Sequence, residues 1–520
     1  MPAERVRSTI IDTPLRALID RQSQSLAEAP YVLAARSERR VSYAQLAAHV
    51  NAWDHATTVW NMTPGDRVGL LITDPIDFAL SFLALLAQGL WVAPMDPTTS
   101  YVKGPQLNNR IANLQLRVVL SDRPAPFETG VDWHQLPDLR SESGHQNLSP
   151  HVAGTYASGG VILASSGTTG APKIMALPAA QLLLTAEQVA LHNGLEHADR
   201  GLNALPLWHI NAEVVGLLAT LVGGASLTLD DRFHRTGFWA LADQCQITWI
   251  NAVPAIISRL SALHEGEIVP SRIRFIRSAS APLSPTLLKQ FENNTGVPVI
   301  ESYGMTEAAS QISANPLDGP RKIGSVGRAV GVAVRVVTMA NATPGQVAAT
   351  NEVGTVEIKG PSVIKRYEGT GYEDRFDHDG WLDTGDLGYL DEDSFLFLVG
   401  RSDDVINRGG EKIFPREIED VILGVRGVVG AAVIGVADDV FGQVPISYVQ
   451  LEGITYSTPV EELQIATKEI HDALVAAFSR ARRPVNINVV AQLPAHATGK
   501  IQKRDLGTGA VPVLFQEHVS

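Results

Sequence analysis

Short apolar runs alternate with longer amphipathic stretches along most of the chain. The clearest runs are rich in Val, Ile and Leu and lie at residues 67–72, 161–164, 247–250, 273–276 and 297–300. Short apolar runs separated by helical patterns are typical of parallel strands whose faces are covered by helices. The pattern therefore predicts an α/β fold.

The pattern changes twice in the C-terminal half. After Gly324 the chain breaks into short strands and turns, with residues 354–360 as one clear strand, which predicts a small β-rich subdomain. A polar, glycine-rich segment at residues 401–410 then precedes a new mixed α/β pattern that reaches about Leu506. We expect the main domain boundary between residues 402 and 403, and a loose tail from Gly507 onward.

Two apolar stretches approach the length of a membrane span. Residues 78–95 are interrupted by Gly89 and Pro94, and residues 214–229 are interrupted by Gly223-Gly224. Such interruptions favour a buried helix followed by a strand in each stretch.

The composition excludes several classes of protein. The 520 residues are 45% hydrophobic, which suits a large core and more than one domain, and their formal net charge of −13 argues against a nucleic-acid partner or an anionic membrane surface. The single cysteine, Cys245, excludes an intramolecular disulfide and a Cys-based zinc cluster. Charged residues from Glu4 to Asp12 interrupt the N-terminus, so we expect neither a signal peptide nor a transit peptide, and a cytoplasmic protein.

Residues 164–173, Ala-Ser-Ser-Gly-Thr-Thr-Gly-Ala-Pro-Lys, form a hydroxyl-rich glycine loop that ends in a lysine. An irregular connection, predicted over residues 123–160, leads up to it. Backbone N–H groups freed by glycine turns, together with hydroxyls and an ammonium group, can bind a polyphosphate. The loop is not a Walker A motif, because Pro172 directly precedes Lys173 and no Ser or Thr follows.

Four further segments follow this loop in order: Glu301-Ser-Tyr-Gly-Met-Thr-Glu307, Thr384-Gly-Asp-Leu-Gly388, residues 401–415 and Thr498-Gly-Lys-Ile501. Together with the loop they resemble the signature set of the adenylate-forming superfamily of acyl-CoA synthetases, adenylation domains and luciferases. The resemblance implies an N-terminal domain, residues 1–402, of two helix-covered, mostly parallel sheets with a β-rich subdomain. It also implies a small, mobile α/β C-terminal domain, residues 403–520.

The resemblance further implies roles in binding ATP and Mg²⁺. Thr168, Thr169 and Lys173 would hold the β- and γ-phosphates, and Glu307 with Thr168 would support Mg²⁺. Thr306 would contact the α-phosphate. The adenine would stack on Tyr303, and Asp386 with Arg401 would hold the ribose. The remaining residues assigned to nucleotide binding are Ser165, Ser166, Gly167, Gly170, Ser280, Ala281, Pro282, Glu301, Ser302 and Gly304.

Lys500 resembles the family lysine that bridges the substrate carboxylate and the α-phosphate, and Asp403 matches the hinge about which the C-terminal domain turns between half-reactions. After that turn Gly409 and Gly410 would line the pantetheine channel. Residues 435–443, including Phe441, resemble the pattern that meets coenzyme A, although Gln443 replaces a frequent glutamate. A carrier-protein phosphopantetheine arm is the alternative acceptor, and a non-catalytic nucleotide-binding regulator is an alternative from another class.

The resemblance places the acyl pocket in five stretches: residues 208–213, 251–254, 278–282, 302–304 and 310–312. His209 occupies the gating aromatic position, and the expected pocket residues are Trp208, Asn211, Asn251, Val253, Ser278, Gly304 and Ser310. Residues 278–282 and Phe238-Trp239 resemble the oxalate-CoA ligase branch. No Lys or Arg lies inside the five stretches, so a second carboxylate would lack a partner. We therefore expect a medium-to-large apolar monocarboxylic acid.

Overall fold

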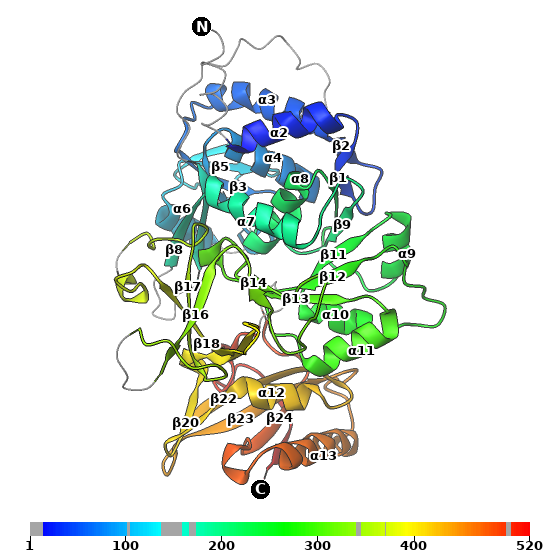
Figure 1. The fold of residues 1–520 in the computed structure, drawn as a ribbon, viewed down its shortest axis with the longest axis vertical. Helices are drawn as coiled ribbons and strands as arrows, with labels where there is room; N and C mark the ends of the chain where they lie inside the picture. The colour runs from blue at the N-terminus through cyan, green and yellow to red at the C-terminus, as the bar shows by residue number, and fades with distance from the viewer. Residues whose placement is uncertain are drawn as a thin grey trace.

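Two large sheets form the scaffold of the N-terminal part of the protein (Figure 1). The computed structural model describes residues 14–100, 104–136, 159–165, 173–339, 345–369, 371–495 and 501–519. The predicted α/β class with mostly parallel sheets is confirmed, because most neighbouring strands in both large sheets run parallel.

The first sheet has six strands in the order β6-β5-β3-β4-β7-β8. Its strands are β3 (Arg67–Leu71), β4 (Trp91–Pro94), β5 (Val118–Ser121), β6 (Asp132–Gln135), β7 (Gly160–Ser165) and β8 (Lys173–Pro178). Strand β6 corrects the expectation of an irregular connection over residues 123–160, because it pairs in parallel with β5 at the sheet edge. None of its four residues is fully buried, so the strand has no apolar alternation that would mark it in the sequence.

The second sheet has nine strands in the order β15-β14-β13-β12-β11-β9-β10-β1-β2. Its strands are β1 (Pro30–Ala34), β2 (Arg40–Ser42), β9 (Arg200–Asn203), β10 (Ser226–Leu229), β11 (Trp249–Ala252), β12 (Phe275–Ser278), β13 (Val299–Tyr303), β14 (Ser313–Ala314) and β15 (Arg328–Ala329). Strands β11, β12 and β13 begin about two residues later than the apolar runs that predicted them. The runs include residues that lead into each strand.

Helices cover these sheets, and the aliphatic and aromatic side chains between the layers form one large core. The helices of this part are α2 (Pro14–Leu26), α3 (Tyr43–Val59), α4 (Pro75–Ala87), α5 (Pro97–Ser100), α6 (Gly104–Leu114), α7 (Ala179–His192), α8 (Ala219–Val222), α9 (Phe238–Gln244), α10 (Pro254–Ser261) and α11 (Pro285–Thr295), with 3-10 turns at η3 (Thr306–Ala308) and η4 (Glu373–Arg375). Among the described residues, no helix combines the length and the apolar character that crossing a membrane requires.

Helix α4 shows why residues 78–95 form a buried helix followed by a strand. The Asp74 side chain caps the helix by accepting a hydrogen bond from the Asp77 N–H, and Pro75 occupies the first turn, where its missing donor costs nothing. Nearly every later residue of α4 is buried, and Gly89 (φ 74°) turns the chain into β4. This prediction is confirmed.

The second apolar stretch contains a π-helix, η2 (Ala212–Leu218), which runs on into α8. All seven residues of η2 are buried. Gly224 (φ 65°) then reverses the chain into β10. The predicted order of helix and strand is confirmed, but the wider helical turn was not predicted, because a hydrophobic run carries no periodic signal that separates π from α geometry.

The β-rich subdomain is the four-stranded antiparallel sheet β16 (Ala333–Thr338), β17 (Gly354–Lys359), β18 (Leu382–Leu390) and β19 (Leu396–Arg401). The C-terminal part contains β20 (Ile406–Arg408), β21 (Glu411–Ile413), β22 (Val428–Asp438), β23 (Gly442–Leu451), β24 (Asn486–Val490), β25 (Val513–His518), α12 (Pro415–Leu423), α13 (Val460–Ala477), and the 3-10 turns η6 (Arg480–Arg482) and η7 (Lys503–Asp505). Strand β25 corrects the expected loose tail, because it pairs antiparallel with β24.

The chain passes from one sheet to another near residue 403. Strand β19 ends at Arg401, the 3-10 turn η5 spans Ser402–Asp404, and β20 begins a different sheet at Ile406. The C-terminal part has its own hydrophobic clusters. Figure 1 shows α12 on the side of this part that faces the large domain, and α13 on the far side. Movement about Asp403 stays a prediction.

Candidate active site

Three residues predicted to bind the nucleoside meet at one place, where Tyr303 ends β13, Arg401 ends β19 and Asp386 lies within β18. The Tyr303 hydroxyl donates a hydrogen bond to one carboxylate oxygen of Asp386, and Arg401 Nη1 donates to the other oxygen at 3.0 Å. Asp386 and Arg401 are also cross-strand partners. Burial, followed by the charge of Asp386, raises the pKa of Tyr303 well above its ordinary value, so the phenol stays a donor. We call these three residues the nucleoside group.

Gly385 makes this approach possible. Its φ of 75° favours glycine, and a methyl group at this position would lie 2.8 Å from Arg401 Nη2 and 3.1 Å from Arg375 Nη2. Arg375 is held by the Asp383 carbonyl, to which its Nη2 donates at 2.6 Å. The guanidinium groups of Arg375 and Arg401 therefore both lie close to the backbone of Gly385, beside Asp386.

Glu307, the predicted support for Mg²⁺, lies in η3 directly after Thr306 and is 8% exposed. The Tyr367 hydroxyl donates to Glu307 Oε1 at 2.8 Å. The Lys173 ammonium lies 5.4 Å from the centre of the Tyr367 ring and 5.0 Å from that of Tyr372. The two tyrosines thus position the lysine and the carboxylate, a role that no sequence motif indicated.

Lys173 sits among charges of both signs. Partial burial lowers its pKa, the positive charge of Arg375 lowers it further, and the negative charge of Glu307 acts in the opposite direction. The neighbouring cations Arg375 and Arg401 suit an anionic ligand, because its negative charge would lie close to three positive groups. We call Lys173 and Glu307 the Lys173–Glu307 pair.

The central residues of the glycine loop, Ser166 to Gly170, and the predicted catalytic Lys500 lie outside the described residues. The two ends of the loop are described. Ser165 ends β7, Lys173 begins β8, and the two residues are antiparallel partners. The two ends of the loop are therefore held together by β7 and β8. Lys173 at the start of β8 lies close enough to Glu307 for their charges to interact.

Gly304 allows two backbone segments to touch at the centre of the site. A methyl group at Gly304 would lie 1.4 Å from the carbonyl oxygen of Ser310, so only glycine fits. Ala309 (φ 49°) and Ser310 (φ 95°) adopt left-handed conformations that cost energy for residues with a side chain. Strain of this kind clusters at functional sites, and here it brings the predicted pocket residue Ser310 against the nucleotide-binding segment.

The other predicted nucleotide residues occupy two places near β12. The Ser302 hydroxyl donates to the Ser278 carbonyl at 3.0 Å, which ties β13 to β12. Ser280 has a φ of 73° and is exposed in the loop after β12, together with the half-buried Ala281 and the exposed Pro282. Both places lie at the carboxyl ends of parallel strands, where α/β sheets bind ligands.

Glu301 differs from its neighbours, because its electrostatic partners lie in the C-terminal part. It is 2% exposed, its Oε1 accepts a weak hydrogen bond from the Leu283 N–H at 3.4 Å, and its Oε2 has no hydrogen-bond partner among the described residues. Burial raises its pKa to about 7, while Arg416 of α12 acts to lower it. Burial also raises the pKa of Asp420 in α12 to about 6. Two carboxyl groups at the contact with α12 therefore titrate near neutral pH.

We expect this contact to weaken as the pH rises. A carboxyl group whose folded pKa exceeds its unfolded value binds more protons when folded, so stability is lost between pH 4.5 and about 7 for Glu301. The variant Glu301→Gln removes this titration. Thermal melts should show the variant gaining stability relative to the unmodified protein as pH goes from 5.5 to 7.5. The exposed Glu265→Gln serves as control, and parallel pH profiles for Glu301→Gln and the parent would contradict the assignment.

A network of side-chain amides forms one wall of the predicted acyl pocket. Asn251 Nδ2 donates to Asn203 Oδ1 at 3.0 Å and to Asn211 Oδ1 at 2.8 Å. The other predicted pocket residues are near this network in the fold. Val253 and Ser278 are buried at the ends of β11 and β12, and Trp208 and His209 are half-buried just before η2, with ring centroids 6.1 Å apart.

Arg277 is a residue of this wall that the sequence reasoning missed. It immediately precedes the expected pocket stretch 278–282 and pairs in register with Asn251. It is 1% exposed, and its Nη2 donates to Gln311 Oε1 at 2.9 Å. Burial lowers its pKa to about 10, so it is cationic at neutral pH. A charged residue within the apolar run Phe275-Ile276-Arg277-Ser278 was the available signal.

The residues predicted to meet coenzyme A lie together in the C-terminal part. The Gly409 N–H donates to the Phe441 carbonyl at 2.8 Å, and the Arg408 guanidinium lies 5.0 Å from the centre of the Phe441 ring. Gln443 accepts a hydrogen bond from the Asn407 N–H at 2.9 Å. Figure 1 shows the β20 hairpin at the outer edge of this part. No described contact joins Gly409, Gly410 or Phe441 to the nucleoside group.

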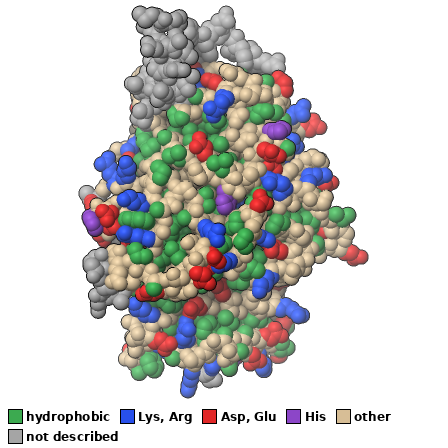
Figure 2. All heavy atoms as spheres, viewed as in Figure 1, with side chains coloured by type: hydrophobic (Ala, Val, Ile, Leu, Met, Phe, Trp, Pro, Cys, Tyr) green, Lys and Arg blue, Asp and Glu red, His purple; other side chains and the backbone are tan. Residues whose placement is uncertain are grey.

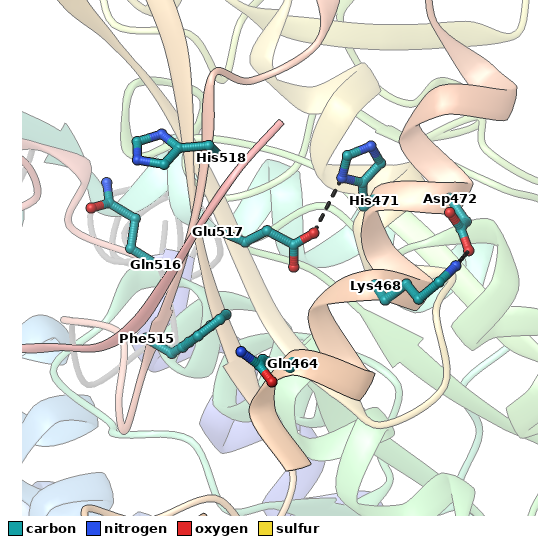
Figure 3. A pocket seen from close by; sticks show the side chains of 8 residues that line it. All are labelled: Gln464, Lys468, His471, Asp472, Phe515, Gln516, Glu517 and His518. Atoms are coloured by element: carbon teal, nitrogen blue, oxygen red, sulfur yellow. Dashed lines mark hydrogen bonds and ion pairs between the residues drawn. The ribbon is translucent and has the colours of Figure 1, made fainter. Parts of the chain in front are cut away.

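Another hollow lies between α13 and β25 (Figure 3). It is an open groove whose charged groups pair with one another: His471 lies 3.2 Å from Glu517, and Lys468 lies 2.5 Å from Asp472. The surface in Figure 2 shows Lys and Arg interspersed with Asp and Glu over the visible face, with no basic stretch among its described residues. Neither feature competes with the site described above.

Comparison with known proteins finds similarity over almost the whole chain. A model of the AMP-binding enzyme family matches residues 19–368, and a model of the AMP-binding enzyme C-terminal domain matches residues 417–500. Sulfoacetate–CoA ligase of Cupriavidus necator is 33% identical over 96% of this chain and 99% of its own length. Oxalate–CoA ligase of Arabidopsis thaliana is 31% identical over 85% of this chain and 88% of its own length.

One solved structure also bears on the ligands. O-succinylbenzoate coenzyme A synthetase of Bacillus subtilis, in complex with ATP and a magnesium ion, superposes with a TM-score of 0.78. It is 26% identical, and the match covers 94% of this chain and 98% of that one.

Proposed function

The chain belongs to the AMP-binding enzyme family and is a CoA ligase that uses ATP, Mg²⁺ and coenzyme A, and we propose that the site described above adenylates an acid and passes its acyl group to free coenzyme A. The observation that carries the assignment of the site is that the nucleoside group lies close to the Lys173–Glu307 pair. Residues from four separate segments of sequence converge there.

In the first half-reaction, a carboxylate oxygen of the acid bonds to the α-phosphorus of ATP while the bond from that phosphorus to the bridging oxygen of pyrophosphate breaks. Asp386 would accept hydrogen bonds from the ribose, since two of the roughly four lone-pair positions of its carboxylate are used by Tyr303 and Arg401. Lys173 would bind phosphate oxygens, on which negative charge accumulates as pyrophosphate leaves.

The residues present fit a magnesium ion. Mg²⁺ prefers hard oxygen ligands, and the Glu307 carboxylate lies in a 3-10 turn next to the Thr306 hydroxyl. When bound, the ion neutralises phosphate charge. Tyr367 orients the Glu307 side chain through its hydrogen bond to Oε1.

In the second half-reaction, the thiol sulfur of coenzyme A attacks the acyl carbon, the thiol proton is lost, and AMP leaves. We propose that Gly409, Gly410 and Phe441 reach the site by rotation of the C-terminal part about Asp403. Gly409 and Gly410 lie in the β20–β21 turn and Phe441 in the neighbouring β22–β23 turn, and their hydrogen-bonded contact supports this step, because the two turns would arrive together. The His209 ring would gate the acyl group at the start of η2.

The names of the relatives support a substrate that carries a second acidic group. Sulfoacetate, oxalate and O-succinylbenzoate, the acids in the relatives' names, all have one. The pocket stretches contain no Lys or Arg, which favours an apolar monocarboxylic acid. Arg277, one residue outside them, is a cation that a second acidic group could meet.

The test is Mg-ATP-dependent pyrophosphate release measured over a panel of acids, with and without coenzyme A. Acid-dependent release that turns over only with coenzyme A, accompanied by acyl-CoA, is the expected result. Acid-dependent ATP–pyrophosphate exchange that coenzyme A cannot discharge would move the acceptor to a carrier protein. Absence of exchange with every acid would overturn the proposal in favour of a nucleotide-binding regulator.

A further inference from the structure

Arg277 is a buried cation whose hydrogen-bonding capacity is mostly unused. Its Nη2 is bonded to Gln311, but Nε and Nη1 have no hydrogen-bond partner among the described residues, and no described carboxylate forms an ion pair with it. A buried charge without a partner is costly, and a bound anion would supply the missing partner. Nη2 keeps a second N–H, which can act with an N–H of Nε or of Nη1 in two-pronged contact with an anion.

The groups around Arg277 are polar and not anionic. Asn251 Oδ1 and Gln311 Nε2 also lack partners among the described residues. His192 cannot balance the charge of Arg277, because an imidazole is either neutral or positive; burial and then the charge of Arg277 lower its pKa and favour the neutral ring. Glu213 in η2 is fully buried, and that burial raises its pKa well above its ordinary value, which favours the neutral carboxyl. The described surroundings thus hold one positive charge and unpaired amide atoms.

The contacts of Arg277 place it behind the part of the predicted acyl site where the reacting carboxylate would lie. It is next to Ser278, whose carbonyl accepts the Ser302 hydroxyl. Gln311 follows Ser310, which packs against Gly304. Arg277 pairs in register with Ile300, three residues before Tyr303, which corresponds to about 10 Å along a strand. The guanidinium therefore belongs to the back of the acyl site, a short distance behind the nucleoside group.

We propose that Arg277, with Gln311 and Asn251, binds a second anionic group of the substrate, so that the acid is short and carries a carboxylate or sulfonate at its far end. This inference rests on the proposed function. The second anion would accept hydrogen bonds from one open edge of the guanidinium and from the free Gln311 amide donor. The expected apolar monocarboxylic acid would leave these donors unpaired.

The first test compares acids of matched shape with the unmodified enzyme. Oxalate, malonate and succinate differ from isobutyrate, isovalerate and 4-methylpentanoate by exchange of one carboxylate for an isopropyl group of similar size. Sulfoacetate and 3,3-dimethylbutanoate form the corresponding sulfonate pair. We expect acyl-CoA formation with at least one dianion at a kcat/KM about thirtyfold or more above that of its apolar partner. Comparison of the sulfonate pair with the carboxylate pairs identifies which anionic group the site binds.

The second test uses Arg277→Met, which removes the charge at similar length, and Arg277→Lys, which keeps it. In Arg277→Met the preferred dianion should lose about thirtyfold or more in kcat/KM, while its apolar partner should keep or gain activity. Arg277→Lys should retain part of the preference. Arg274→Met is the matched control, because Arg274 pairs with Asp199 away from this cluster. The retained reaction of the apolar acid also shows that the variant folds.

Two results would overturn the inference and leave the proposed function standing. One is acyl-CoA formation by the unmodified enzyme with apolar acids and none with dianions. The other is an equal loss for both members of a pair in Arg277→Met, which would give Arg277 a purely structural role through Gln311. Failure of ATP–pyrophosphate exchange with every acid would instead remove the proposed function, and the inference with it.

Discussion

Replacement of Asp386 by Ala should lower kcat/KM for ATP in the adenylation half-reaction by about a thousandfold. The change removes the acceptor for the ribose and leaves the Tyr303 hydroxyl and the Arg401 guanidinium without their partner. Each hydrogen bond to a charged group contributes about 1.5–3 kcal/mol, and two such bonds correspond to a loss near that size. ATP–pyrophosphate exchange at varied ATP concentration measures it.

A matched control separates this effect from loss of stability. Asp391 directly follows β18 of the same small sheet, five residues beyond Asp386, and its carboxylate pairs with Lys322 at 2.5 Å. Asp391→Ala should lower the melting temperature to a similar extent and leave exchange nearly intact. Comparable losses of exchange in the two variants would show that Asp386 acts only through the stability of the sheet.

Replacement of Lys500 by Ala should lower the rate of acyl-adenylate formation by several hundredfold and spare the thioester half-reaction. The family places this lysine between the substrate carboxylate and the α-phosphate, and loss of one such donor costs 10² to 10³ in rate, or about 3–4 kcal/mol. Acyl transfer from chemically prepared acyl-adenylate to coenzyme A should continue, because the lysine would have left the site with the C-terminal part by then.

Lys503 provides the control for this experiment. It lies three residues farther along the chain, and its ammonium pairs with Glu419 at 2.7 Å within the C-terminal part. Lys503→Ala removes the same charge and should leave adenylation within a few-fold of the parent. Equal loss of both half-reactions in Lys500→Ala would reject the assigned role, since a residue needed for one step cannot impair both equally.

The elements that sequence predicted well are those whose signal is local. The strand at residues 354–360 and the buried helix that α4 forms both have bounded apolar patterns, and Asp74 with Pro75 marks a helix start by its chemistry. The π-helix η2 and the terminal strand β25 were not predictable in this way. Their geometry depends on packing against neighbouring elements and on pairing with β24, which a single-chain pattern does not contain.

The candidate site shows the same difference between local sequence signals and contacts made by residues distant in sequence. The motifs predicted that Tyr303, Asp386 and Arg401 bind one nucleoside, and the structure brings their side chains together, while their roles toward ATP stay a prediction. Tyr367 and Arg277 carry no motif, and each acts through a neighbour that is distant in sequence: Glu307 for the tyrosine and Gln311 for the arginine. Pocket limits drawn from motif edges stopped at Ser278, one position short of the cation that changes the expected substrate.

The π-helix η2 gives the acyl wall an unusual kind of adjustability. A π turn is commonly an α-helix that has accommodated one additional residue, and Asn211, which bonds Asn251, directly precedes it. Deleting a single residue within η2 would let the segment rewind as an α-helix and would rotate the helical residues on one side of the deletion by about 100° relative to those on the other. Substrate range in such a scaffold can therefore change by the length of one helical segment, with the side chains predicted to contact ATP left in place.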